Sequence, residues 1–148
     1  MNLTARIESD YLAALKAREE LTVSVLRMLK AAAKMLQVEL RRPLSDDEFF
    51  DVIAKQAKQR RESIEQFAKA NRVDLVEKEE RELAILVAYL PAPLTDAELL
   101  AAVDAAVAEL DARSMKDMGR VVQSVLAAHK GQVDGKRVSS AVKARLAS

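Results

Sequence analysis

Residues able to carry out chemistry on their own are sparse in this chain of 148 residues. It has one histidine, His129, and no cysteine, whereas a zinc site needs three or four nitrogen or sulfur ligands. Neither G-x-G-x-x-G nor G-x-x-x-x-G-K occurs, so no phosphate-binding glycine loop is expected. The glutamates between 77 and 82 alternate with Lys78 and Arg81, which favours a solvated helix face with ion pairs over an acid–base pair. The sequence therefore predicts no catalytic residue, no metal site and no cofactor, and leans away from an enzyme.

Basic residues are a stronger lead, because their distribution is uneven. Residues 95–111 hold five acids and no base, a net charge of −5, whereas residues 112–148 hold eight bases and two acids, a net charge of +6. A basic surface attracts phosphates and releases their counterions. The basic tail has no aromatic ring that could stack on unpaired bases, so we expect it to bind a structured RNA through shape and backbone. The residues predicted to contact nucleic acid are Lys116, Arg120, Lys130, Lys136, Arg137 and Lys143.

Three of these residues flank a short glycine-containing segment. Gly131 and Gly135 allow a tight turn before the last helix. We expect Gly131 to end the preceding helix in the left-handed conformation and Asp134 to cap the last helix. We expect Lys130, Lys136 and Arg137 to project from the apex of this turn toward a phosphate backbone. Two further basic stripes lie earlier in the chain, and the sequence leaves open whether they take part in binding. The first comprises Arg27, Lys30, Lys34 and Arg41, and the second Lys55, Lys58, Arg60 and Arg61.

The elements that must position these residues are all helical. Half of the residues are hydrophobic and only 3% are aromatic, a composition typical of α-helical proteins, and no strand pattern occurs. Capping boxes are expected at Ser45–Glu48 and Thr95–Glu98, and Asn71 is expected to cap a further helix. The apolar spacing predicts helices over residues 3–18, 21–42, 46–70, 72–90, 96–110, 114–130 and 135–146. In the second helix the buried face is expected to hold Val25, Leu29, Ala32, Leu36 and Leu40.

Pro91-Ala-Pro93 is the clearest boundary in the chain, because proline lacks an amide proton and stiffens a connector. We expect an all-α fold with two domains, an N-terminal bundle of about four helices (1–92) and a small C-terminal lobe of three helices (93–148). The first thirty residues are charged throughout, and no uncharged run approaches the roughly 18 residues that span a bilayer. The expectation is a cytoplasmic protein without a membrane partner.

Motifs along the whole chain resemble the GatB/YqeY family, and in particular its small stand-alone members. The motifs are Arg27-Met-Leu-Lys-Ala-Ala32, Lys58-Gln-Arg-Arg-Glu-Ser-Ile-Glu-Gln-Phe67, Glu77-Lys-Glu-Glu-Arg-Glu-Leu-Ala-Ile-Leu86, Tyr89-Leu-Pro91, Met115-Lys-Asp-Met-Gly-Arg120 and Lys130-Gly-Gln-Val-Asp-Gly-Lys-Arg-Val138. The resemblance implies relatedness to the tail with which the B subunit of the glutamine-dependent aminoacyl-tRNA amidotransferase engages tRNA. That tail is not where the amidotransferase performs its chemistry.

Residues and resemblance together predict a non-catalytic accessory module that binds tRNA through its basic C-terminal lobe. Such a module would act free or docked on an aminoacyl-tRNA synthetase or amidotransferase. The alternative is a helical adaptor between proteins, favoured if the tail charges pair with Asp104, Glu109 and Asp111 and leave no net basic face. A carbon–nitrogen ligase activity with glutamine as amide donor is implied only by similarity, and only within a larger complex.

Overall fold

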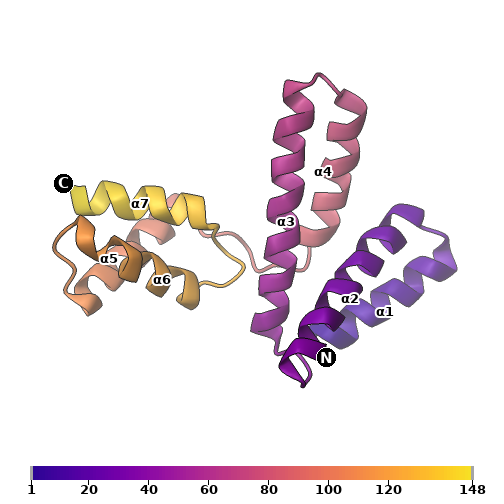
Figure 1. Ribbon diagram of the computed structural model, residues 1–148, viewed down its shortest axis with the longest axis horizontal. Helices are drawn as coiled ribbons and strands as arrows, with labels where there is room; N and C mark the ends of the chain where they lie inside the picture. The colour runs from indigo at the N-terminus through magenta and orange to yellow at the C-terminus, as the bar shows by residue number, and fades with distance from the viewer. Residues whose placement is uncertain (1, 148) are drawn as a thin grey trace. The chain divides into compact units, whose positions relative to one another are not determined.

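The computed structural model describes residues 2–147, and this part of the chain is all-α, as expected, without a strand (Figure 1). One turn of 3-10 helix, η1 (Met115–Asp117), precedes the sixth helix. The α-helices are α1 (Leu3–Ala17), α2 (Glu20–Leu40), α3 (Asp46–Lys69), α4 (Val73–Val87), α5 (Asp96–Leu110), α6 (Met118–Ala128) and α7 (Gly135–Ala147). None of the described helices combines the length and hydropathy that a bilayer crossing requires.

Two helices begin as the sequence predicts, with reciprocal capping boxes. The Glu48 amide donates to Ser45 Oγ at 3.2 Å, and the Ser45 amide donates to Glu48 Oε1 at 2.9 Å. Thr95 and Glu98 make the same pair of bonds at the start of α5. Both glutamates accept bonds best when ionised. Hydrogen bonding from Arg42, and then from the Ser45 amide, lowers the pKa of Glu48 from its ordinary 4.5 to about 2.

Helix ends show how a chain without glycine in its first 118 residues stops its helices. Arg18, Arg41, Asn71 and Asp111 all adopt the left-handed conformation just after a helix. At the end of α3 the Asn71 amide donates to the Ala68 carbonyl and the Arg72 amide to the Phe67 carbonyl, which is a Schellman arrangement. The prediction that Asn71 caps α4 is therefore wrong, because asparagine tolerates the left-handed region and ends α3 instead. The residue before α4 is Arg72, whose side chain makes no capping bond.

Residue contacts divide the chain into two compact units, and the boundary lies between Leu90 and Pro91. We call the first unit 1 and the second unit 2. The core of unit 1 draws on all four of its helices: Leu3, Ile7, Val25, Leu26, Leu29, Ala33, Phe49, Val52, Ile53, Leu86 and Tyr89. The predicted buried face of α2 is right for Val25 and Leu29. It is wrong at the end of the helix, where Leu40 is exposed.

Tyr89 locks the end of unit 1 onto α1. Its hydroxyl donates to Asp10 Oδ2 at 2.6 Å, and the guanidinium of Arg6 lies 4.8 Å from its ring centroid. Burial and then the bond to Asp10 raise the pKa of Tyr89 well above its ordinary value. The Tyr89-Leu-Pro91 motif thus fixes where unit 1 ends.

A buried ion cluster joins α3 to α4, where the sequence suggested a solvated face. Arg60 Nε lies 3.0 Å from Glu82 Oε2 and 3.7 Å from Glu79 Oε2, and all three side chains are largely buried. The prediction of a solvated face holds for Glu77 and Glu80, which are exposed. The expected i,i+4 ion pair also forms, since Lys78 Nζ lies 3.8 Å from Glu82 Oε1. The solvated face is wrong for Glu79 and Glu82, because these two side chains turn toward α3 and are largely buried against Arg60.

Candidate nucleic-acid interface

Unit 2 positions the predicted binding residues on three helices packed around a small aliphatic core. Its buried side chains include Leu99 and Val103 of α5, Val121 and Val125 of α6, and Val138 and Val142 of α7. Each of these pairs has a spacing of four residues, so one stripe of each helix faces the core. The opposite stripes carry the charged residues.

Lys136 and Lys143 lie on the outer face of α7. They are seven residues apart, which places them on one side of the helix and about 10 Å apart along its axis. Both are exposed, as is Ser140 between them. Within residues 2–147 neither lysine has an ion-pair partner. This row of α7 can therefore meet an anion without breaking an existing contact.

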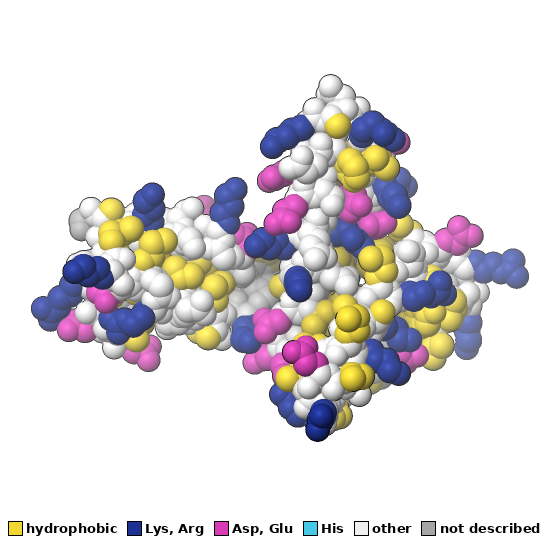
Figure 2. Space-filling model, in the orientation of Figure 1, with side chains coloured by type: hydrophobic (Ala, Val, Ile, Leu, Met, Phe, Trp, Pro, Cys, Tyr) yellow, Lys and Arg dark blue, Asp and Glu magenta, His cyan; other side chains and the backbone are white. Residues whose placement is uncertain are grey.

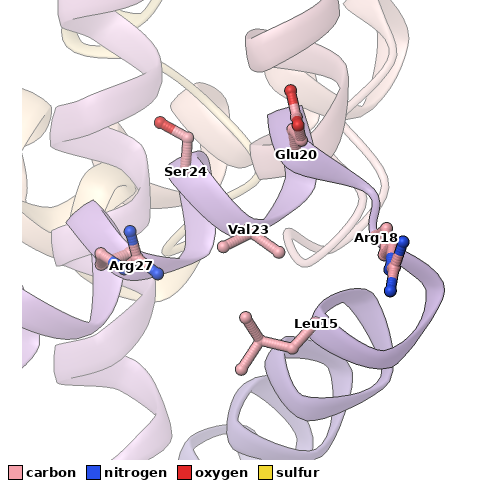
Figure 3. A pocket seen from close by; sticks show the side chains of 6 residues that line it. All are labelled: Leu15, Arg18, Glu20, Val23, Ser24 and Arg27. Carbon is pink, nitrogen blue, oxygen red and sulfur yellow. The ribbon is translucent and has the colours of Figure 1, made fainter.

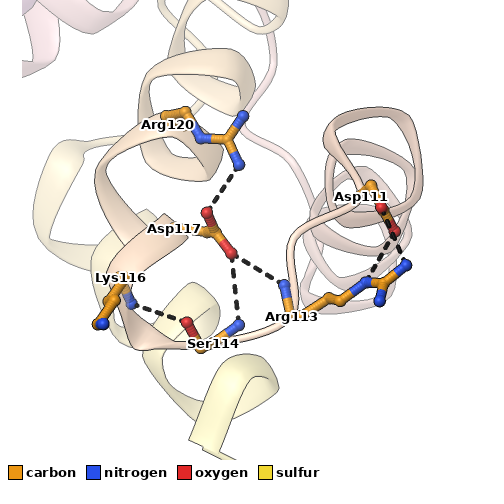
Figure 4. Close-up of polar contacts among 6 residues, drawn as sticks. All are labelled: Asp111, Arg113, Ser114, Lys116, Asp117 and Arg120. Atoms are coloured by element: carbon orange, nitrogen blue, oxygen red, sulfur yellow. Dashed lines mark hydrogen bonds and ion pairs between the residues drawn. The ribbon is translucent and has the colours of Figure 1, made fainter.

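Lys116 and Arg120 flank the start of α6, and of the two only Arg120 has an ion-pair partner in the described chain. Asp117 accepts from the Arg113 amide at 3.0 Å and from the Arg120 guanidinium at 2.7 Å (Figure 4). These bonds lower the pKa of Asp117, and the bond from the Arg113 amide has the largest effect. Arg120 is thus already paired, whereas the exposed Lys116 side chain has no ion pair in the described chain.

At the turn between α6 and α7, Lys136 is exposed and Lys130 is half-buried, whereas Arg137 differs from the expectation. Gly131 adopts the left-handed conformation, with φ of 78°, and the Asp134 carboxylate caps α7 by accepting from the Arg137 amide at 2.8 Å, both as expected. The Arg137 side chain, however, donates to the Leu94 carbonyl and to Asp96 Oδ1, both at 2.7 Å. The prediction that Arg137 projects from the apex is wrong, because a backbone carbonyl and a carboxylate draw the guanidinium back onto the segment before α5.

Gln132 adds two further bonds to the same segment. Its carbonyl accepts from the Leu94 amide at 3.0 Å, and its side-chain amide donates to the Ala92 carbonyl at 3.2 Å. Together with Arg137 it attaches residues 92–96 to the α6–α7 turn. We call these contacts the turn clamp. The clamp gives Gln132 and Arg137 a structural role that the sequence did not indicate, since their partners are about 40 residues away.

The arginines and lysines of unit 2 behave differently. Every arginine of the unit pairs with an aspartate: Arg113 with Asp111, Arg120 with Asp117, Arg137 with Asp96 and Arg145 with Asp104. Three of these aspartates belong to the acidic segment 95–111. Three of the tail's arginines are therefore compensated by the acidic segment of the same unit, and the cations of unit 2 that are exposed without an ion pair among residues 2–147 are the lysines Lys116, Lys136 and Lys143. Figure 2 shows basic side chains spread over the surface of this unit.

Two exposed glycines lie next to these lysines. A Cβ at Gly119 or Gly135 would meet no atom within 4 Å, and neither glycine has the left-handed conformation. The fold therefore needs glycine at Gly131 but not at these two positions. Glycine inside a helix costs up to about 1 kcal/mol relative to alanine. The absence of a side chain at each position leaves the backbone open to a bulky partner.

Only some of the cations in the two basic stripes of unit 1 are exposed without an ion-pair partner among residues 2–147. Lys30 pairs with Glu8 at 2.6 Å and lies 4.0 Å from the ring centroid of Tyr11, and Arg60 is in the buried cluster. The members of the two stripes that are exposed and have no ion pair within residues 2–147 are Arg27, Lys34, Arg41, Lys55, Lys58 and Arg61.

An open hollow of about 350 Å³ lies between the end of α1 and the start of α2. Leu15 and Val23 face it, with Arg18 and Arg27 at its two ends (Figure 3). Within residues 2–147 no group of three or more His, Asp or Glu side chains is placed to hold a metal ion. Glu20 and Ser24 complete the lining, so the hollow combines two cations, one carboxylate and an apolar floor.

The comparison with known families decides the relationship. A family model described as "Yqey-like protein" matches residues 4–146. The chain belongs to the YqeY-like family.

Several fungal proteins are similar to this member of the family. A protein of Eremothecium gossypii named "Altered inheritance of mitochondria protein 41, mitochondrial" is 38% identical over 100 residues, which is 66% of this chain and 55% of that protein. Proteins of the same name from Kluyveromyces lactis and Pyrenophora tritici-repentis are 31% identical over 134 residues and 28% identical over 141 residues. These matches cover 89% and 93% of this chain, and 67% and 77% of the respective relatives. The chain thus matches little more than half of the Eremothecium protein.

Proposed function

We propose that this YqeY-like protein is a non-catalytic accessory module that binds tRNA through the exposed lysines of unit 2. The observation that carries the proposal is the contrast between paired arginines and exposed lysines. Lys116, Lys136 and Lys143 are exposed without ion pairs in the described chain, whereas the arginines of unit 2 are paired with aspartates. Lys130 and Arg120 would stand beside these lysines in contact with the same backbone.

The chemistry of these lysines fits a phosphate backbone. A lysine ammonium is a compact point charge on a flexible stem, so it can follow phosphates without fixed geometry. Two exposed glycines beside the lysines would let a wide RNA surface approach the helix backbone. The resemblance of the tail to the tRNA-engaging tail of the amidotransferase B subunit points to tRNA among structured RNAs.

The proposal holds for more than one compartment. The sequence favours the cytoplasm, and the fungal relatives carry the word "mitochondrial" in their names. Both compartments contain tRNA. We propose that the protein acts on tRNA in whichever of the two it occupies, free or docked on a synthetase or amidotransferase.

An adaptor between proteins is the second candidate, and one observation favours it. Asp96, Asp104 and Asp111 of the acidic segment pair with arginines of the tail, which reduces the net basic character of unit 2. Glutamine-dependent ligase activity is proposed only for a larger complex. The reason is that ATP activation and ammonia delivery need a phosphate cradle and a nucleophile that the sequence does not offer.

Binding of a tRNA transcript at several salt concentrations tests the proposal. The triple change Lys116→Gln, Lys136→Gln and Lys143→Gln removes up to three phosphate contacts, so the slope of log affinity against log salt should fall by about three units. Circular dichroism should show unchanged helicity, because all three side chains are exposed.

A matched control comes from α3. Lys55→Gln, Lys58→Gln and Arg61→Gln remove the same charge from exposed positions of unit 1 and should leave the slope within about one unit of the parent. An unchanged slope in the unit 2 variant, or no binding by the parent protein at low salt, would reject tRNA binding in favour of the adaptor. An equal loss in both variants would extend the interface to unit 1.

A further inference from the structure

The outer face of α2 carries a row of exposed apolar side chains that nothing in unit 1 covers. Met28, Met35 and Val38 are 51%, 74% and 68% exposed. Their spacings of seven and three residues place them on one side of the helix over about 15 Å. Of the ten large hydrophobic side chains exposed in residues 2–147, these three and Leu40 lie on α2, whereas the other six are spread over α1, α4, α5 and η1. The exposed Glu39 lies four residues after Met35 on the same side of the helix. An apolar row of this kind is a candidate interaction surface.

A row of cations borders the apolar row. Arg27 and Lys34 are seven residues apart, so they share one edge of α2, about 80–120° around the helix from Met28 and Met35, and Arg41 directly follows the last residue of α2. All three are exposed, and within the described chain none has an acidic partner. Arg27 donates a hydrogen bond to the Tyr11 hydroxyl at 3.2 Å, which orients its guanidinium. Figure 2 shows hydrophobic side chains interspersed with Lys and Arg over the α1–α2 region.

The opposite edge of the apolar row borders α3. Gln56 donates to the Met28 carbonyl at 3.5 Å, and an Arg60 nitrogen lies 3.9 Å from the Met28 sulfur. Glu39 is the one exposed acid on the second half of α2. The surface formed by Met28, Met35, Val38 and the edge Arg27, Lys34, Arg41 is called the α2 face below.

We propose that the α2 face is a docking site for an acidic amphipathic helix of another protein. The apolar row takes the apolar face of that helix, and the cationic edge pairs with carboxylates on its flank, the mode by which amphipathic helices dock on apolar surfaces. Methionine suits such a surface, because its flexible thioether adapts to different apolar partners.

The pattern of the α2 face disfavours two other occupants. A second copy of this chain would bring the same cationic edge opposite the first, and like charges across an interface are unfavourable. A nucleic acid backbone would satisfy the cations but would leave three side chains that are more than half exposed without apolar contacts. The proposal is independent of tRNA binding, which rests on lysines of unit 2.

Fluorescence anisotropy with the full chain and two designed helical peptides tests the proposal. Each peptide has about 16 residues, with leucine at i, i+3, i+4 and i+7 and with either glutamate or lysine on the flanks. The acidic peptide should bind at least tenfold more tightly than the basic one. Met35→Glu with Val38→Glu should weaken binding of the acidic peptide at least tenfold, and Lys34→Glu with Arg41→Glu should reverse the preference between the peptides.

Val73→Glu is the matched control, because Val73 is a 64% exposed valine elsewhere in unit 1 and should leave peptide binding unchanged. Equal binding of the acidic and basic peptides, or an equal loss in the control, would overturn the proposal. Two other occupants are distinguished directly. Binding to anionic phosphatidylserine vesicles that is lost in Met35→Glu/Val38→Glu, without peptide binding, would make the face a lipid-binding one. Concentration-dependent dimerisation lost in the same variant would make it a self-association surface, and either result would replace the proposal.

Discussion

A substitution of Arg137 tests whether this residue stabilises the fold or contacts RNA. Its guanidinium donates to the part-buried Leu94 carbonyl at 2.7 Å, and a hydrogen bond that involves a charged group contributes about 1.5–3 kcal/mol. The second contact, to Asp96 Oδ1, adds less, because the Asp96 side chain is 96% exposed. Arg137→Met keeps the length of the side chain and removes its donors. We expect it to cost about 2 kcal/mol at the turn clamp.

Hydrogen exchange at the Leu94 amide measures this cost locally. That amide donates to the Gln132 carbonyl at 3.0 Å inside the clamp, so its exchange reports clamp opening. Because 1.4 kcal/mol corresponds to a factor of ten, a loss of about 2 kcal/mol should accelerate exchange by about 30-fold in Arg137→Met. Peptides from unit 1, such as those covering Val25 and Leu29, should exchange at unchanged rates.

The neighbouring Lys136→Met provides the reciprocal control. Lys136 is exposed and outside the clamp, so its loss should leave Leu94 exchange unchanged and should lower the salt dependence of tRNA binding by about one unit. The reasoning would be refuted if Arg137→Met left Leu94 exchange unchanged while it weakened tRNA binding as much as Lys136→Met. Arg137 would then be a contact residue, as the sequence alone suggested.

Two further predictions concern unit 1. Arg60→Met leaves the buried Glu82 with the exposed Lys78, 3.8 Å away, as its remaining ion-pair partner among residues 2–147, and should cost up to about 3 kcal/mol of unfolding free energy, measured by urea denaturation. The double change Arg60→Met/Glu82→Leu should recover most of that loss, and equal stability of the two variants would contradict the account. Glu48 has a folded-state pKa of about 2 against an ordinary 4.5, so its ionised form stabilises the fold above about pH 4.5 and this contribution is lost as the pH falls through about 2. A carbon-13 NMR titration should show that pKa rising toward 4.5 in Arg42→Gln, and an unmoved pKa would assign the shift to the Ser45 amide instead.

Local features of this protein were accessible from its sequence. The capping boxes at Ser45 and Thr95 depend on residues three positions apart, and the left-handed Gly131 depends on its own missing side chain. The all-α class follows from helical apolar spacing together with the composition. Such features need only neighbouring residues, so a linear pattern contains their cause.

Tertiary structure decides which charged side chains are paired or buried and which are exposed. The run Lys58-Gln-Arg-Arg61 does not distinguish Arg60, which α4 buries against Glu82, from Arg61, which is exposed. Likewise Arg137 and Lys136 are adjacent in sequence, yet one holds Leu94 and the other faces outward. In both cases the local sequence pattern is that of a helix surface. It does not distinguish the two cations, because the partner that pairs with or buries a cation comes from a distant segment. Composition could therefore locate the basic tail, but only the packing of α5 against α6 and α7 determined which of its charges are available to a ligand.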